Sequence, residues 1–120
     1  MRNLVLKTLG IILLISVLFP LGHAHAQFIS GNDLVIYMRE YEKDERGDTS
    51  ASDIEASRYI GYVIGVYDAH RFLFDSPSGT SIGQVCAIVA KYLNEHPEKW
   101  NQTASDLVLE ALKQAYPKNR

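Results

Sequence analysis

The sequence predicts an all-α fold, a small bundle of about four helices that follows a cleaved signal peptide. Apolar residues recur at three- and four-residue spacing in four separate stretches, which is the period of a helix with one buried face. Two of these stretches open with a Ser-x-x-Glu or Ser-x-x-Gln capping box. No stretch of comparable length shows a strand pattern, so helices are expected to form the whole core.

The N-terminal 26 residues have the pattern of a secretory signal peptide. Arg2 and Lys7 provide a basic start, an apolar run follows over 9–21, and the small-x-small sequence at 24–26 is typical of a cleavage site. The apolar run is short for an uncleaved anchor, and no cysteine follows it as in a lipoprotein. We therefore expect one helical domain over 27–120, located in the periplasm.

The charge of this predicted domain excludes several kinds of partner. Without Arg2 and Lys7 the chain keeps 10 basic and 14 acidic residues, a net charge of −4. Nucleic acids and anionic membrane surfaces attract basic patches, so neither is an expected partner after signal cleavage. Cys86 is the only cysteine, so no disulfide can form within the chain.

The first predicted helix begins near Asn32, with Ser30 or Asn32 as its cap. Its apolar face comprises Leu34, Tyr37, Met38 and Tyr41. The helix runs into the charged segment 42–48, which we expect to end it in a solvated loop.

The second predicted helix begins at the capping box of 52–55 and ends near Phe72. Small residues four apart form a stripe along it: Ser57, Gly61, Gly65 and Ala69. Glycine inside a helix costs about 0.5–1 kcal/mol against alanine, so the stripe indicates that another backbone lies close. Packing against a neighbouring helix of the same chain is favoured, and a homodimer interface is the alternative.

The third predicted helix begins at a second capping box, 81–84, and ends before Pro97. The fourth starts at Thr103 and stops at 116–117, where Tyr-Pro ends it. Residues 118–120 are expected to form a frayed tail.

No pattern of catalytic or metal-binding residues stands out. Cys86 lies on the apolar face of the third helix, where a small core residue is expected. His70 and His96 stand at helix ends, where a cation is favoured by the helix dipole. Neither histidine has the cysteine neighbours of a zinc site. We expect no enzyme, no metal and no cofactor; a Cys–His enzyme is a weak alternative.

Several segments in a fixed order carry a family resemblance: 31–34 (GNDL), 61–69 (GYVIGVYDA), 77–85 (PSGTSIGQV), 91–98 (KYLNEHPE), 104–108 (ASDLV), 111–112 (AL) and 116–117 (YP). Together they resemble the Rap1a/Tai family, the immunity proteins of type VI secretion systems. The resemblance implies a periplasmic helical protein that binds and inhibits a peptidoglycan amidase effector. It also implies a tendency to dimerise, and inhibition by a loop and an adjoining helix surface that occupy the active-site cleft.

The sequence departs from the family pattern at two cysteines. Members often carry one cysteine just before the proline of the loop after the second helix, where this chain has Asp75 or Ser76. They often carry another after the final proline, where this chain has Lys118. Cys86 replaces neither, so the loop around 75–79 is expected to be less rigid than in relatives that have both.

Two loops beside the third helix are the candidate partner-binding regions. One contains Asp75, Ser76 and Ser78, and the other contains Glu95, His96, Glu98 and Trp100. Trp100 is equally compatible with partner contact and with packing over the start of the fourth helix. Because the loops lie at opposite ends of one helix, a dimer is expected to bring one loop from each subunit together. A small acid-stress chaperone of the periplasm is the alternative function.

Overall fold

The structure is a computed structural model that describes residues 2–5 and 28–119. Four α-helices form the domain: α2 (Gly31–Glu45), α3 (Asp53–Ala69), α4 (Ile82–Glu95) and α5 (Ala104–Ala115), with the 3-10 turns Arg71–Leu73 and Pro97–Lys99 between them. The described residues contain no strand beyond an isolated bridge between Ser30 and Thr103. The predicted all-α fold is therefore confirmed.

Residues 2–5 form a short helical turn, and the rest of the predicted signal peptide lies outside the described residues. Within the described part of the chain, no helix combines the length and the apolar character needed to cross a membrane.

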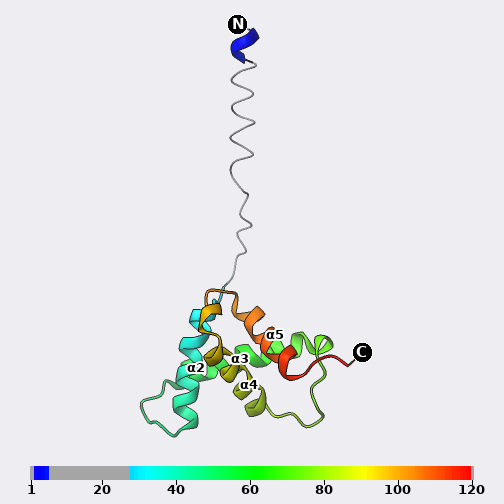
Figure 1. Cartoon of the computed structure of the whole chain (residues 1–120). Helices are drawn as coiled ribbons and strands as arrows, with labels where there is room; N and C mark the ends of the chain where they lie inside the picture. The colour runs from blue at the N-terminus through cyan, green and yellow to red at the C-terminus, as the bar shows by residue number, and fades with distance from the viewer. Residues whose placement is uncertain (1, 6–27, 120) are drawn as a thin grey trace.

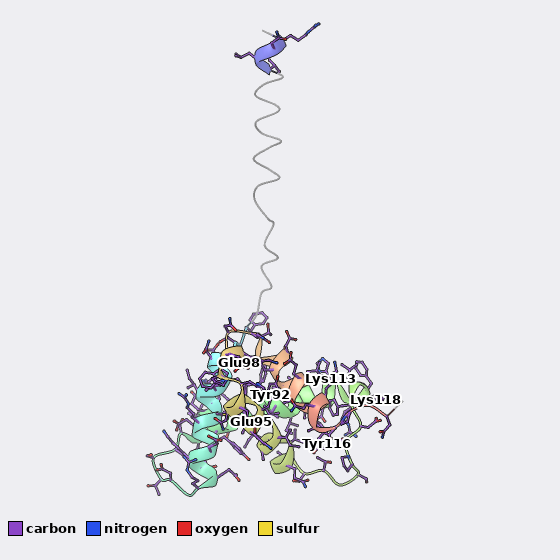
Figure 2. The ribbon with its side chains drawn as sticks, viewed as in Figure 1. Tyr92, Glu95, Glu98, Lys113, Tyr116 and Lys118 are labelled. Atoms are coloured by element: carbon purple, nitrogen blue, oxygen red, sulfur yellow. The ribbon has the colours of Figure 1, made fainter. Side chains whose placement is uncertain are left out.

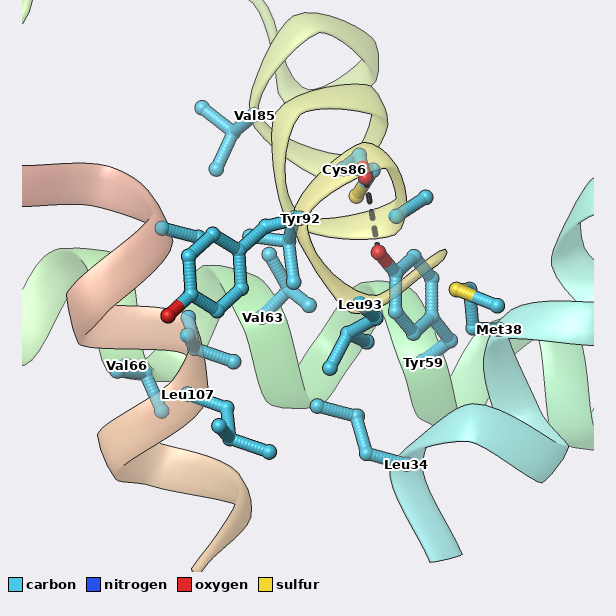
Figure 3. Close-up of a cluster of buried hydrophobic side chains, with 14 of the residues drawn as sticks. Leu34, Met38, Tyr59, Val63, Val66, Val85, Cys86, Tyr92, Leu93 and Leu107 are labelled. Carbon is cyan, nitrogen blue, oxygen red and sulfur yellow. Dashed lines mark hydrogen bonds between the residues drawn. The ribbon is translucent and has the colours of Figure 1, made fainter. Parts of the chain in front are cut away.

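Helix α3 is the centre of the domain. It packs against α2, α4 and α5, while α4 and α5 also pack against each other (Figure 1). Apolar side chains from all four helices meet in one core. Figure 3 shows part of this core, where the Tyr59 hydroxyl of α3 donates a 2.8 Å hydrogen bond to the Cys86 carbonyl of α4. Both residues are completely buried, so this bond fixes α3 against α4.

The start of α2 is held by a cap and by a close approach of the backbone. Ser30 is the cap: its hydroxyl accepts from the amide of Asp33, and its own amide donates to the Asp33 carboxylate. At Gly31 a Cβ atom would lie 2.6 Å from the carbonyl oxygen of Trp100, which is closer than atoms pack. Only glycine fits here, because α2 begins directly against the loop that precedes α5.

The two predicted capping boxes have different outcomes. At α4 both bonds of the box form between Ser81 and Gln84, as predicted. At α3 the Ser52 hydroxyl accepts from the Glu55 amide at 3.4 Å, but the Ser52 amide donates to Glu40 of α2 instead. The start of α3 is thus tied to the neighbouring helix, a contact that the local pattern could not predict.

The stripe of small residues on α3 does not pack against any other helix that the structure describes, so the favoured prediction of packing within the chain was wrong. Its four members are exposed: Ser57, Gly61, Gly65 and Ala69. A Cβ atom at Gly61 or Gly65 would meet nothing within 4 Å. The larger side chains of α3, including Tyr59, Val63 and Tyr67, form its buried face. Each stripe residue lies two positions from such a residue, and because a helix turns about 100° per residue, the stripe faces the opposite side.

The C-terminal tail is also better held than the sequence predicted. The amide of Asn119 donates to the Asp75 carboxylate at 2.7 Å, and the Lys118 ammonium lies 3.0 Å from the same carboxylate. The Asp75 amide in turn donates to the carbonyl of Tyr116. Lys118 and Asn119 therefore lie against the loop after α3, and the expected fraying does not begin at residue 118.

Candidate partner-binding surface

The α3–α4 loop, residues 74–81, has an anchored beginning and an exposed tip. Phe74 is buried between the rings of Tyr67 and Tyr116, with centroid distances of 5.2 and 6.5 Å. The Ser76 hydroxyl lies 2.6 Å from the hydroxyl of Tyr67. After these contacts the chain reaches the exposed residue Ser78.

The tip of this loop is a tight turn. Gly79 has a φ of +85°, which suits glycine, and the Thr80 hydroxyl donates to the carbonyl of Pro77 at 2.7 Å. Residues 77–79 are all exposed. Of the candidate residues in this loop, only Ser78 is directly presented to solvent, while Asp75 and Ser76 hold the base of the loop.

The α4–α5 loop, residues 96–103, lies over the end of α4. The ring of His96 packs against Tyr92 with a centroid distance of 4.4 Å, and its Nδ1 lies 3.1 Å from Glu98. Glu95 and Glu98 are exposed. Trp100 is half-buried: its indole N–H donates to the Leu93 carbonyl at 2.8 Å. Trp100 thus packs on the core, and only part of its ring faces solvent.

A polar cluster fixes this loop to α5. The Lys99 ammonium donates to the hydroxyl of Tyr92 and to the carboxylate of Glu110, both at 2.8 Å. The Tyr92 hydroxyl donates to the same carboxylate. Bonding to Glu110 and Tyr92 raises the pKa of Lys99, so Lys99 keeps its positive charge across the physiological range.

The structure keeps the two loops apart. Helix α4, with 14 residues, separates them by about 20 Å at 1.5 Å per residue. Figure 2 labels Glu98 in the α4–α5 loop and Lys118, which pairs with Asp75 at the base of the α3–α4 loop, and the two lie well apart. The predicted site residues therefore form two groups, and one small contact surface on a single chain does not include both.

A groove between α2 and α4 was missed by the sequence analysis. It has a volume of about 560 Å³ and is lined by Tyr41, Glu42, Glu45, Arg46, Ala87, Ala90, Lys91, Asn94 and Glu95. The two alanines, three apart on α4, leave space opposite Tyr41. Their spacing was visible in the sequence, but only the packing of α4 beside α2 makes it a groove.

Cys86 lies in the core, as predicted. Burial, with a smaller contribution from the charge of Glu45, raises the pKa of its thiol to about 11. Among the described residues, no group of three or more histidine, cysteine, aspartate or glutamate side chains is placed to hold a metal ion.

Comparison with models of known protein families shows to which family this chain belongs. The family model of the Rap1a immunity proteins matches residues 30–117, from the cap of α2 to the proline that follows α5. The chain belongs to the Rap1a immunity protein family. The match includes all four helices and both candidate loops. No individual curated protein gave a significant match. Membership in the Rap1a family implies a role in immunity to a type VI secretion effector.

Proposed function

We propose that this Rap1a protein acts in the periplasm as a stoichiometric inhibitor of a peptidoglycan amidase effector. It would protect the cell from effector delivered by itself or by its kin. The match over residues 30–117 supports the immunity role. The signal pattern of the first 26 residues supports the periplasmic location, where peptidoglycan and such an effector meet. In this proposal the protein binds and blocks, and catalyses nothing itself.

The observation that carries this proposal is the α3–α4 loop, with its fixed base and exposed tip. An inhibitor that enters an active-site cleft loses less conformational entropy when its loop is already ordered. Asp75 and Ser76 supply that order through their bonds to the C-terminal tail and to Tyr67. Ser78 is at the tip and is the residue we propose to enter the cleft.

The second loop is proposed to act from a partner subunit. Glu95, His96, Glu98 and Trp100 lie about one helix length away from Ser78, so a single chain does not present both loops to one cleft. A homodimer would do so. The stripe of Ser57, Gly61, Gly65 and Ala69 is the face we propose for it, because nothing in the described chain packs there.

Affinity capture tests the proposed function. The full-length sequence, tagged at its C-terminus, is expressed in the parent bacterium with secretion active and recovered from the periplasmic fraction. The proposal expects one exported amidase in near-equal amount, together with removal of the first 26 residues by mass spectrometry. A protein retained in the cytoplasm, or a periplasmic protein that captures no amidase, would contradict it.

A chaperone function is the alternative, and exposed apolar side chains favour it. Ile54, Phe72 and Ile82 are 67%, 69% and 57% exposed. A chaperone of the acid-stress kind should expose more apolar surface as pH falls. Fluorescence of a dye that binds apolar surface, followed from pH 7 to about 3, distinguishes the two. For an immunity protein, dye fluorescence should rise only at a pH where circular dichroism shows that the helices unfold. For a chaperone, dye fluorescence should rise while circular dichroism still shows intact helices.

A further inference from the structure

The groove between α2 and α4 has an apolar floor and an acidic rim. Tyr41, Ala87 and Ala90 form the floor. Tyr41 is itself buried from below by the ring of Tyr59, with a centroid distance of 5.0 Å. Glu42 and Glu45 stand on the α2 side of the rim. Such a combination fits a side chain with an apolar stem and a polar head better than it fits a wholly apolar one.

The acidic side of the rim lacks a cationic partner. Within residues 2–5 and 28–119, neither Glu42 nor Glu45 has a basic side chain within 4.0 Å. Glu42 accepts a hydrogen bond from the neutral amide of Asn94 at 2.8 Å. Across the groove, Lys91 lies 3.8 Å from Glu95 and compensates that carboxylate.

The carboxylates of Glu42 and Glu45 affect the pKa of Tyr41 on the groove floor. Burial raises the pKa of Tyr41, and electrostatic interactions with Glu45, then Cys86, then Glu42 raise it further. The same carboxylate of Glu45 makes a smaller contribution than burial to the raised pKa of Cys86 on α4. A cation in the groove would therefore lie near two carboxylates, Glu42 and Glu45, that form no ion pair within residues 2–5 and 28–119.

We infer that this groove receives an arginine or lysine side chain of the effector protein, with its stem over Tyr41, Ala87 and Ala90 and its charged head at Glu42 and Glu45. The inference rests on the proposed function for the identity of the partner, but the chemistry of the groove can be tested without it. Arg46 also lines the groove, so its positive charge opposes the entry of a cation. Its removal should strengthen the binding of an incoming cation.

The first test uses n-butylguanidinium, which carries the apolar stem and the head group of arginine. Amide shifts of the ¹⁵N-labelled protein should change at Tyr41, Ala87 and Ala90 and saturate in the millimolar range. Loss of one exposed charge contact should weaken this binding about threefold in Glu45→Gln, and more in the double variant with Glu42→Gln. Arg46→Gln should bind more tightly. Butanol and pentanoate, which lack the cation, should leave these amides unchanged.

Asp44→Asn is the matched control. It removes one negative charge from the same turn of α2 as Glu45, but Asp44 does not line the groove. The inference predicts near-normal binding in this variant. Absence of shifts at the groove, shifts that survive the double glutamine substitution, or equal loss in Asp44→Asn would each overturn the proposed cation site.

The second test separates the groove from the proposed function. Once the amidase is captured, its affinity is measured for wild type, for the double variant Glu42→Gln/Glu45→Gln and for Asp44→Asn. The inference predicts at least about tenfold weaker binding for the double variant alone, since buried cation–carboxylate contacts contribute more than exposed ones. Equal affinities would overturn the role of the groove and leave the immunity function standing. Failure of wild type to bind any amidase would remove the proposed function, and the butylguanidinium result would still decide the cation site.

Discussion

Asp75, at the base of the α3–α4 loop, holds Lys118 and Asn119 of the C-terminal tail through one carboxylate. The family resemblance places cysteines near these two positions, at 75–76 and at 118. The chain therefore brings together, by an ion pair and a backbone hydrogen bond, two regions that the resemblance associates with cysteines. These contacts hold the base of the loop 75–79, although the chain lacks both cysteines.

Neutralising this carboxylate should release the tail. We predict that Asp75→Asn exposes residues 117–119 to carboxypeptidase digestion, because the bonds to Asn119 and Lys118 weaken together. Digestion followed by mass spectrometry measures the effect. Lys118→Ala, which removes only the ion pair, should have a smaller effect, since the Asn119 amide still donates to Asp75. Equal resistance of Asp75→Asn and wild type would contradict this account.

The same contact predicts a pH dependence. The Asn119 amide, and then Lys118, holds the pKa of Asp75 below its ordinary value of 3.8. A carboxyl group whose folded pKa is lowered contributes stability above its unfolded pKa and loses that contribution as pH falls through the folded one. Hydrogen exchange at the Asn119 amide should thus keep its protection at pH 5 and lose it below pH 3.8. In Asp75→Asn the protection should be low at both values, and a wild-type protection that does not change across this range would count against the contact.

The buried Tyr59 hydroxyl should contribute to global stability. Tyr59→Phe removes its hydrogen bond to the Cys86 carbonyl while keeping the ring, and we predict a loss of about 1 kcal/mol in the free energy of unfolding. Urea denaturation measures it. Tyr37→Phe is the control: Tyr37 is only partly buried, with its ring beside Arg58, so its hydroxyl should matter little. Similar losses in both variants would show that the Tyr59 bond has no special role.

Two glycines should respond to alanine in opposite directions. Gly61→Ala is expected to stabilise the domain by about 0.5–1 kcal/mol, because helix propensity improves and the new methyl group meets nothing. Gly31→Ala should destabilise it by about 1–3 kcal/mol, since its Cβ would collide with the Trp100 carbonyl. Thermal unfolding at low protein concentration measures both. Destabilisation by Gly61→Ala would mean that the stripe packs against something in the folded domain.

The Cys86 thiol should be inert in the native protein. Burial raises its pKa to about 11, so little thiolate exists at pH 8, and the side chain is completely buried. Alkylation by iodoacetamide should proceed only as fast as the protein unfolds, and urea should accelerate it. Fast stoichiometric modification under native conditions would instead favour the thiol enzyme considered from the sequence.

Local patterns were sufficient to predict much of the fold. The period of the apolar residues located the four helices. Ser81 was identified as a cap from its own neighbours, and Ser30 was one of two candidates for the cap of α2. The predictions that were wrong concern contacts between distant segments. The orientation of Gly61 and Gly65 depends on which residues of α3 take the buried face. The bonds of Lys118 depend on where the α3–α4 loop passes.

In the candidate site, too, local features were predicted from the sequence and contacts between distant segments were not. The loops were located from their turn residues, but the sequence did not reveal that Asp75 and Ser76 are engaged within the domain while Ser78 is exposed. The α2–α4 groove needs the relative placement of two helices. A charged segment over 42–48 was apparent and was interpreted as the end of a helix followed by a solvated loop. Sequence alone did not place Ala87 and Ala90 beside it.

The most direct measurement is a titration of the amidase activity of the captured effector with this protein. Release of peptides from purified peptidoglycan is followed as increasing amounts of this protein are added. The account predicts that hydrolysis falls linearly and stops near one immunity chain per amidase, and that a Ser78→Arg variant, altered at the loop tip, requires an excess. Undiminished hydrolysis in the presence of a several-fold excess of wild-type protein would contradict the inhibitory function.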